Sequence, residues 1–278
     1  MSESELSIRI AHWLGTHALA VFGVALCATL LLAALAGWAL RRYAHPREDS
    51  TLPPALFLLL RTGIGFALIV GAGAGFAELA EELLDEDALA RADEALTEAL
   101  RMSVPLGAVQ VFAWLTRLGD VAVLTALGIV VALILLAARR RWLAVGWAVA
   151  LGGNALLNVT LKQVVARVRP VHDDGLVLAH GFSFPSGHSS GAVVAYGMLA
   201  YVLTRFLPPR WNAPLGLAAV ALAFTVGSSR VFLRVHFASD VVAGFASGTA
   251  WLAVCIVSIQ LTRWVRGRGR NGGQQGYS

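Results

Sequence analysis

The sequence predicts an all-α membrane protein, a polytopic bundle of about seven transmembrane helices. Of its 278 residues 57% are hydrophobic and only 14% are charged, whereas a soluble domain is about half apolar and a quarter charged. The excess forms continuous apolar runs, each near the ~20 residues that a helix needs to cross a bilayer. The only other structure that satisfies its backbone hydrogen bonds in lipid is a closed β-barrel, whose strands alternate apolar and polar residues. These runs do not alternate in that way. The runs are 18–40, 55–77, 119–138, 142–161, 188–207, 213–229 and 239–262.

The positions of the basic residues predict the orientation. Twelve of the 22 fall in the connections 41–54, 139–141, 205–212 and 263–278, and cytoplasmic loops carry such an excess. We therefore expect the N-terminus and the alternate connections outside. The abundant arginine and alanine indicate a GC-rich bacterial source, so the expected location is the inner (cytoplasmic) membrane. Although the net charge is +5, the arginines lie at the ends of apolar runs, so no nucleic-acid partner is expected.

Three parts are expected along the chain. Residues 1–118 hold N-terminal spans and an outer acidic segment, 119–262 form a membrane core, and 263–278 form a disordered cytoplasmic tail rich in Gly, Arg and Gln. The acidic segment, 78–98, carries nine of the 17 acidic residues and has leucines at helical spacing. It is either a solvated amphipathic connector, as charge runs usually are, or an interfacial helix that borders a path into the protein.

Three polar motifs lie at span ends on the predicted outer side. They are KQVVARVRP from Lys162 to Pro170, PSGH from Pro185 to His188, and SRVFLRVHFASD from Ser229 to Asp240. Each alone has an ordinary explanation, such as a helix-end anchor or a helix cap. Together they are harder to dismiss, because charged groups beside spans are costly and usually functional.

The cations of these motifs predict a phosphate pocket. Lys162, Arg169 and Arg230 could converge, and their natural partner is an anion with several oxygens. The turn at Ser186-Gly187 can aim backbone N–H groups at the same anion, with the positive end of the following helix behind it.

The two histidines of the motifs predict covalent catalysis. His236 and Asp240 are four residues apart, which places them on one face of a helical turn. A carboxylate on one ring nitrogen fixes the tautomer and frees the other nitrogen to attack, so His236 is the expected nucleophile. His188 has no evident carboxylate of its own and is expected to protonate the leaving oxygen and then activate water.

A metal site is the competing interpretation. The three cations would repel a divalent ion, and the chain has neither a His-Glu-x-x-His helix nor a cysteine cluster. We therefore expect no metal and no other cofactor. Ligand-type residues outside the motifs are expected in a solvated loop, and the flanking cations are expected to contact lipid headgroups. The former are His172, Asp173, Asp174 and His180, and the latter are Arg167 and Arg234.

With these motifs in this order, the chain resembles the type-2 phosphatidic acid phosphatase superfamily, which shares its site with vanadium haloperoxidases. The family pattern is Lys-x6-Arg-Pro, Pro-Ser-Gly-His and Ser-Arg-x5-His-x3-Asp, and all three match over about residues 119–262. Many members have six spans, so the extra N-terminal span is a departure. The resemblance implies a metal-free phosphatase core with general acid His188, nucleophile His236 and orienting acid Asp240. Its implied phosphate-binding residues are Lys162, Arg169, Ser186, Gly187 and Arg230.

The expected activity is removal of phosphate from a lipid phosphate or lipid pyrophosphate at the outer face of the inner membrane. The reaction is expected to pass through a phosphohistidine. The resemblance implies substrates such as undecaprenyl pyrophosphate, our first choice, phosphatidic acid, phosphatidylglycerol phosphate or lipid A phosphate. The alternatives are a phosphotransferase with a lipid acceptor, a haloperoxidase, and a non-catalytic scaffold, against which the complete set of reactive residues argues. The sequence does not indicate the oligomeric state.

Overall fold

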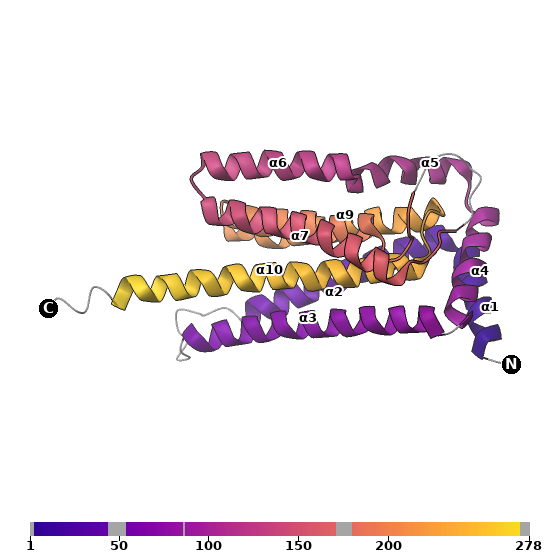
Figure 1. Ribbon diagram of the computed structural model, residues 1–278, viewed down its shortest axis with the longest axis horizontal. Helices are drawn as coiled ribbons and strands as arrows, with labels where there is room; N and C mark the ends of the chain where they lie inside the picture. Colours follow the sequence, from indigo (N-terminus) through magenta and orange to yellow (C-terminus); the bar gives the residue numbers. More distant parts are fainter. Residues whose placement is uncertain (1–2, 44–53, 86, 171–179, 273–278) are drawn as a thin grey trace.

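The computed structural model describes residues 3–43, 54–85, 87–170 and 180–272, and every regular element in these ranges is a helix (Figure 1). The predicted all-α class is therefore confirmed. The elements are α1 (Glu3–Thr16), α2 (Ala18–Tyr43), α3 (Pro54–Asp85), α4 (Asp87–Ser103), α5 (Leu106–Leu115), the 3₁₀ turn η1 (Thr116–Gly119), α6 (Val121–Ala137), α7 (Arg141–Val165), α8 (Gly187–Leu203), the 3₁₀ turn η2 (Pro209–Trp211), α9 (Asn212–Phe232) and α10 (Ala238–Gly272).

Five of the seven apolar runs lie wholly within a helix, and most of the other two, 119–138 and 188–207, falls in α6 and α8. The count of seven spans stays a prediction. Six helical stretches in the described ranges are long and apolar enough to cross a membrane. One of them is the continuous stretch Leu106–Ala137, which joins α5 to α6. The run 188–207 forms α8, which has only 17 residues and so falls just short of a full crossing length.

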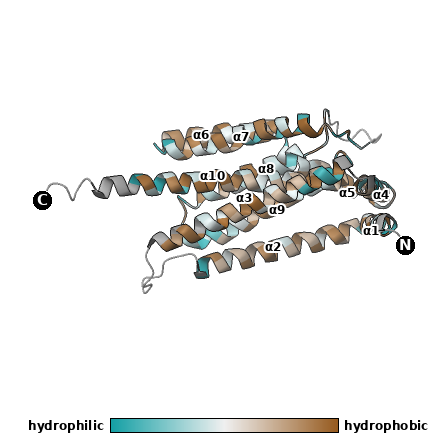
Figure 2. Cartoon of the chain, turned by 60° about the horizontal axis from the view of Figure 1, so that its bottom comes forward, coloured by the Kyte–Doolittle hydropathy of each residue, from teal (hydrophilic) through white to brown (hydrophobic). Residues whose placement is uncertain are grey.

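The long helices run side by side along the molecule, and α1 and α4 lie across one end of them (Figure 1). The long helices are largely apolar along their length, with hydrophilic residues towards their ends (Figure 2). Large apolar side chains such as Val24, Leu32 and Val121 are exposed, because in a membrane the lipid and not a protein core covers them.

The bundle core lies between α6, α7, α8 and α10. Leu135, Trp147, Val194 and Met198 are almost completely buried there. The Trp147 indole Nε1 donates to the Gly128 carbonyl of α6 at 2.8 Å, so the ring is fixed in position as well as buried.

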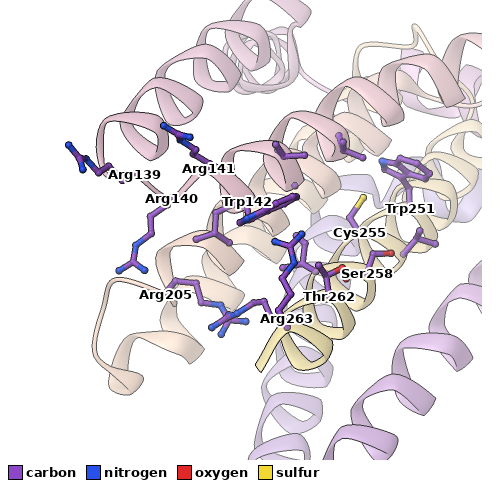
Figure 3. A pocket seen from close by; sticks show the side chains of 17 residues that line it. Arg139, Arg140, Arg141, Trp142, Arg205, Trp251, Cys255, Ser258, Thr262 and Arg263 are labelled. Carbon is purple, nitrogen blue, oxygen red and sulfur yellow. Dashed lines mark hydrogen bonds between the residues drawn. The ribbon is translucent and has the colours of Figure 1, made fainter. Parts of the chain in front are cut away.

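The end opposite α1 and α4 collects arginines from separate parts of the chain (Figure 3). They come from the α6–α7 connection, from the turn after α8 and from α10, and they include Arg140, Arg205 and Arg263. The tail expected from residue 263 differs from the structure, because α10 continues as a helix to Gly272. Arg263 and Trp264 suit the part of α10 where the helix leaves the membrane, since the apolar stretch ends at Arg266. Residues 273–278 lie outside the described part.

Gly153 sets the approach of α7 to α10. A Cβ added at Gly153 would lie 2.2 Å from Cζ2 of Trp251, whereas one at Gly152 would meet nothing within 4 Å. Trp251 cannot swing away without losing the hydrogen bond that its Nε1 donates to the Ala150 carbonyl at 2.9 Å. The glycine is therefore required by packing at residue 153 and not at residue 152.

We predict that G153A lowers the free energy of unfolding by about 1–3 kcal/mol, because the added methyl overpacks the α7–α10 contact. The matched control G152A should be neutral or slightly stabilising, since alanine is favoured over glycine in a helix. Apparent melting temperatures of the purified variants in one detergent measure both effects. Equal melting of the two variants would contradict this assignment.

Candidate active site

The three motifs meet at the end of the bundle near α4. Lys162 lies in the last turn of α7, Arg230 in the last turn of α9, and Asp240 in the first turn of α10. A cavity of about 830 Å³ opens here. Its polar lining brings together the predicted residues Lys162, Arg169, Gly187, His188, Arg230 and His236.

Ser186 caps α8 and joins it to α10. Its Oγ accepts a hydrogen bond from the Ser189 N–H at 3.4 Å, as an N-cap residue does. Its own N–H donates to the Asp240 carbonyl at 2.9 Å. The two helices approach so closely that a Cβ at Gly244 would lie 2.6 Å from the Ser186 carbonyl oxygen. The start of α8 is thereby held against the start of α10.

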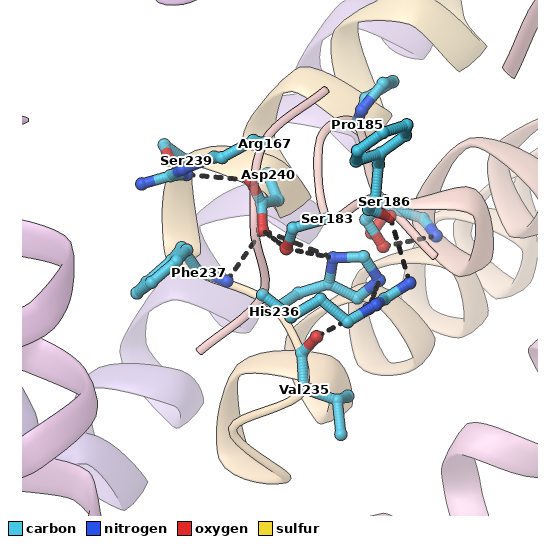
Figure 4. A network of polar contacts seen from close by, with 12 residues as sticks. Arg167, Ser183, Pro185, Ser186, Val235, His236, Phe237, Ser239 and Asp240 are labelled. Atoms are coloured by element: carbon cyan, nitrogen blue, oxygen red, sulfur yellow. Dashed lines mark hydrogen bonds and ion pairs between the residues drawn. The ribbon is translucent and has the colours of Figure 1, made fainter. Parts of the chain in front are cut away.

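His236 is buried and held on both ring nitrogens (Figure 4). Its Nδ1 lies 3.3 Å from Asp240 Oδ2, and its Nε2 lies 3.0 Å from the Arg169 guanidinium. A guanidinium can only donate, so the Nε2 lone pair faces Arg169 and the ring proton sits on Nδ1. Burial lowers the pKa of His236 to about 3. Asp240 opposes this shift, and the nearby charges of Arg169 and Arg230 add to it. The ring is therefore neutral near pH 7.

The cations around His236 are already oriented by backbone carbonyls. Arg169 donates to the Val235 carbonyl at 2.7 Å and to the Gly181 carbonyl at 3.0 Å. Lys162 donates to the carbonyls of Phe182 and Ser183. Partial burial lowers the pKa of the Arg169 guanidinium. These bonds hold both side chains at the cavity without neutralising them.

Arg230 differs from the other cations because part of it has no partner. It is 3% exposed and donates from Nη1 to Thr116 Oγ1 at 3.0 Å. Among the described residues its Nε has no hydrogen-bond partner although the atom is buried. Buried donors are almost always satisfied, so this N–H is available to an anion in the cavity.

Arg167 was expected to contact lipid headgroups, but in the structure it forms ion pairs within the protein. Its guanidinium bridges two carboxylates, Asp240 Oδ1 at 2.8 Å and Asp93 Oδ2 at 2.9 Å. Its Cζ also lies 4.1 Å from the centre of the Phe237 ring. The sequence could not reveal this role, since both acids lie more than 70 positions away.

Asp93 shows that the acidic segment is not uniformly solvated. It lies on α4 and is 4% exposed. Besides pairing with Arg167, it accepts hydrogen bonds from the Ser239 hydroxyl and N–H. Burial raises the pKa of the Asp93 carboxyl, and Ser239 and Arg167 oppose that shift. One acid of the segment 78–98 therefore fixes α4 to the beginning of α10, a contact that neither interpretation of the segment predicts.

His188 also has a carboxylate partner, contrary to expectation. Its Nε2 lies 3.0 Å from Asp120 Oδ1, and both side chains are partly exposed. Asp120 precedes α6. The signal was present in the sequence, because Asp120 is a lone acid at the predicted outer end of an apolar run. The turn at Gly187 is tight as well, since a Cβ there would lie 3.0 Å from Asn158 Oδ1.

His180 is the one described residue of the expected solvated loop, and it lies at the cavity. The His180 side chain is exposed, and its carbonyl accepts from Arg169 at 3.2 Å. Arg234 has a left-handed backbone, with φ of 54°, and its assignment to headgroups stays a prediction. The expected solvated-loop residues His172, Asp173 and Asp174 fall outside the described part of the chain.

The same cavity continues away from the cations along apolar helix faces. This part is lined by α6, α7 and α8, with Leu124, Ile129, Leu151 and Val159 among its residues. One end of the cavity thus suits a multiply charged anion, and the remainder suits a hydrocarbon chain.

The chain is similar to known lipid phosphatases. The PAP2 superfamily model matches residues 141–264. Phosphatidylglycerophosphatase B of Bacillus subtilis (strain 168) is 35% identical over 166 residues, which cover 58% of this chain and 80% of the relative. Undecaprenyl-diphosphatase of Sulfolobus acidocaldarius is 31% identical over 138 residues, 48% of this chain and 63% of the relative.

A solved structure has a similar arrangement of helices over about two thirds of this chain. It is the crystal structure of a transmembrane PAP2-type phosphatidylglycerolphosphate phosphatase from Bacillus subtilis, with a TM-score of 0.63 and 32% sequence identity. The match covers 68% of this chain and 94% of that chain.

We predict that D93N lowers turnover about tenfold and the free energy of unfolding by about 2–3 kcal/mol, because removing one partner of a buried ion pair leaves Arg167 under-compensated. Phosphate release and apparent melting temperature measure the two effects. The control is E94Q, the exposed neighbour on α4, which should match the wild type. If D93N also matched it, Asp93 would not support the site.

We predict that acid destabilises the protein partly through His236. Its pKa of about 3 lies below the ordinary 6.5, so between these values the unfolded chain binds a proton that the folded chain excludes. Stability from this group is therefore present above pH 6.5 and lost as the pH falls through the window. Between pH 7 and 5 the wild type should lose on the order of 2 kcal/mol more than H236N. Parallel melting curves for the two proteins would count against a neutral, buried His236.

Proposed function

Because the chain belongs to the PAP2 superfamily, we propose that it is a multi-pass membrane phosphatase that removes phosphate from a lipid, with phosphatidylglycerol phosphate as the first substrate to test. A relative of which the chain covers 80% is named a phosphatidylglycerophosphatase. Undecaprenyl pyrophosphate is the second substrate to test, since another relative is named a diphosphatase of that lipid.

The observation that carries the proposal is the two-part cavity. Lys162, Arg169 and Arg230 line one part, and apolar faces of α6, α7 and α8 line the rest. A lipid phosphate has the same two parts, a charged headgroup and a hydrocarbon tail. A soluble phosphate ester would gain nothing from the apolar part.

In the proposed complex, the phosphoryl oxygens accept from the three cations and from the start of α8. The unpartnered Arg230 Nε gains its missing acceptor. Arg169 and Lys162 exchange some of their bonds to loop carbonyls for charge-assisted bonds to phosphate, which are the stronger ones. The positive end of the α8 dipole adds to this at Gly187.

The first chemical step transfers the phosphoryl group to His236. Arg169 turns from the ring to the phosphate, so the Nε2 lone pair is free to attack phosphorus. As the N–P bond forms, the bond from phosphorus to the ester oxygen breaks, and His188 donates a proton to that oxygen. Asp240 stabilises the positive charge that develops on the His236 ring, and Asp120 holds the His188 ring beside the leaving group.

The second step returns the enzyme to its starting state. His188, now neutral, takes a proton from water as the water oxygen attacks phosphorus. The N–P bond breaks, inorganic phosphate forms, and the electron pair returns to His236 Nε2. The cations stabilise the spread of negative charge in both transition states.

The site is proposed to face the outer side of a bacterial inner membrane. The opposite end of the bundle carries Arg139 to Arg141, Arg205 and Arg263, and such an excess is typical of the cytoplasmic side. The site would then act on lipids whose headgroups lie in the outer leaflet.

We predict that the purified protein in detergent micelles releases phosphate from phosphatidylglycerol phosphate, phosphatidic acid or undecaprenyl pyrophosphate without an added acceptor. H236A should lower this by about a thousandfold or more, because covalent catalysis is lost, while still melting cooperatively. The control H12A changes an exposed histidine of α1 and should retain full activity. An active H236A would remove the phosphohistidine from the mechanism, and turnover only with an acceptor lipid would make the protein a transferase.

We also predict that activity survives excess EDTA, because Lys162, Arg169 and Arg230 supply the positive charge that a metal ion would otherwise provide. The measurement is phosphate release before and after dialysis against the chelator. Loss of activity that added Mg²⁺ restores would show that the cations are not sufficient.

A further inference from the structure

A second cavity lies at the other end of the bundle (Figure 3). Its volume is about 770 Å³, and it opens between α7, α10 and the turn after α8. α7 has 25 residues, at ~1.5 Å per residue, and runs from this cavity at Arg141 to the candidate active site at Lys162. The charged parts of the two cavities therefore lie near opposite ends of the bundle.

The lining of this cavity is cationic at its mouth and apolar inside. Six arginines line it, and no acidic residue is among its lining residues. The six are Arg139, Arg140, Arg141, Arg205, Arg263 and Arg266. Figure 3 shows the labelled arginines towards one end, with Cys255 and Trp251 further along. Leu143, Val149 and Ile259 add apolar surface, and Ser258 and Thr262 add hydroxyl groups.

Aromatic rings position two of these cations. The Arg266 Cζ lies 3.6 Å from the centre of the Trp142 ring, and the Arg205 Cζ lies 4.5 Å from that of Tyr201. Stacking of this kind leaves the edge of a guanidinium, with its N–H donors, open to a phosphate. Less side-chain freedom then has to be lost when an anion binds.

A general excess of arginine on one side of the membrane does not explain this clustering. Arg41, Arg42 and Arg210 belong to the same predicted cytoplasmic connections, and none of them lines the cavity. The lining arginines come instead from three separate segments and surround one hollow. Like charges so arranged repel one another unless an anion lies among them.

We propose that this cavity binds an anionic glycerophospholipid of the leaflet opposite the candidate active site. The lipid phosphate would lie among Arg205, Arg263 and Arg266, and one acyl chain would lie against α7 and α10. The charge, the hydroxyl groups and the apolar depth match a phospholipid headgroup and tail, and basic pockets between membrane helices bind such lipids. The cavity lining holds no histidine and no carboxylate, so it binds a phosphate without cleaving it. This site is independent of the proposed activity.

The test is native mass spectrometry of the full chain in detergent, titrated with dioleoyl-phosphatidylglycerol and with dioleoyl-phosphatidylcholine. The wild type should bind phosphatidylglycerol more tightly. The variant R205Q/R263Q/R266Q should lose roughly tenfold or more of that apparent affinity, since each cation near a membrane contributes to anionic lipid binding. The control R41Q/R42Q/R210Q removes as much charge from the same connections and should bind as the wild type does.

Both variants keep the candidate active site, so any lipid bound there contributes equally to both. Phosphate release in an uncharged detergent should stay at the wild-type level in both, which separates this proposal from the proposed function. Equal losses in the two variants, or equal binding of the two lipids, would overturn it. Displacement of the lipid by glycerol 3-phosphate at equal concentration would also overturn it, in favour of a soluble anion. If the triple variant does not fold, the single variants R205Q and R263Q replace it in the same titration. Each should lose less of the apparent affinity for phosphatidylglycerol than the triple variant.

Discussion

The buried carboxylate of Asp240 is the constraint on which the rest of the site depends. One oxygen accepts from Arg167, and the other accepts from the Phe237 N–H and Ser183 and faces His236. A carboxylate buried without such partners would cost several kcal/mol. Meeting its needs brings together the segment after α7, the loop before α8 and the start of α10. The contacts that compensate the charge of Asp240 are therefore the same contacts that hold the three segments of the site together.

Such a site can be built only at the ends of membrane helices. In the hydrocarbon core, a cluster of three cations and two carboxylates would have no water to compensate it. At helix ends, loop carbonyls and helix termini are available as partners, and Lys162 and Arg169 use the carbonyls of residues 180–183 in this way. The apolar groove then extends from that end along α6 and α7. A lipid matches this layout because its charge also lies at the edge of the hydrocarbon.

The sequence predicted the helical class and the convergence of the motifs because both follow from local patterns. Apolar runs of membrane length specify helices. The fixed spacings in Lys-x6-Arg-Pro and His-x3-Asp specify which side chains lie together at the ends of these helices. The partners that support the motifs were missed for the opposite reason. Asp93, Asp120 and Arg167 pair across 68 to 74 positions, and no local pattern distinguishes Asp93 from the exposed acids beside it. Its burial follows from how α4 packs, which is decided by the whole fold.

The two ends of α7 show how similar charge can serve different chemistry. Both ends gather arginines around a cavity, so both attract phosphate. Only the end with Lys162 adds two imidazoles, each beside a carboxylate. His236 is the proposed nucleophile, and His188 is the proposed proton donor. Binding an anion does not by itself accelerate its reaction, because uniform binding stabilises the ground state as much as the transition state. Cleavage requires a group that changes its bonding to phosphorus, and the lining of the arginine cavity provides none.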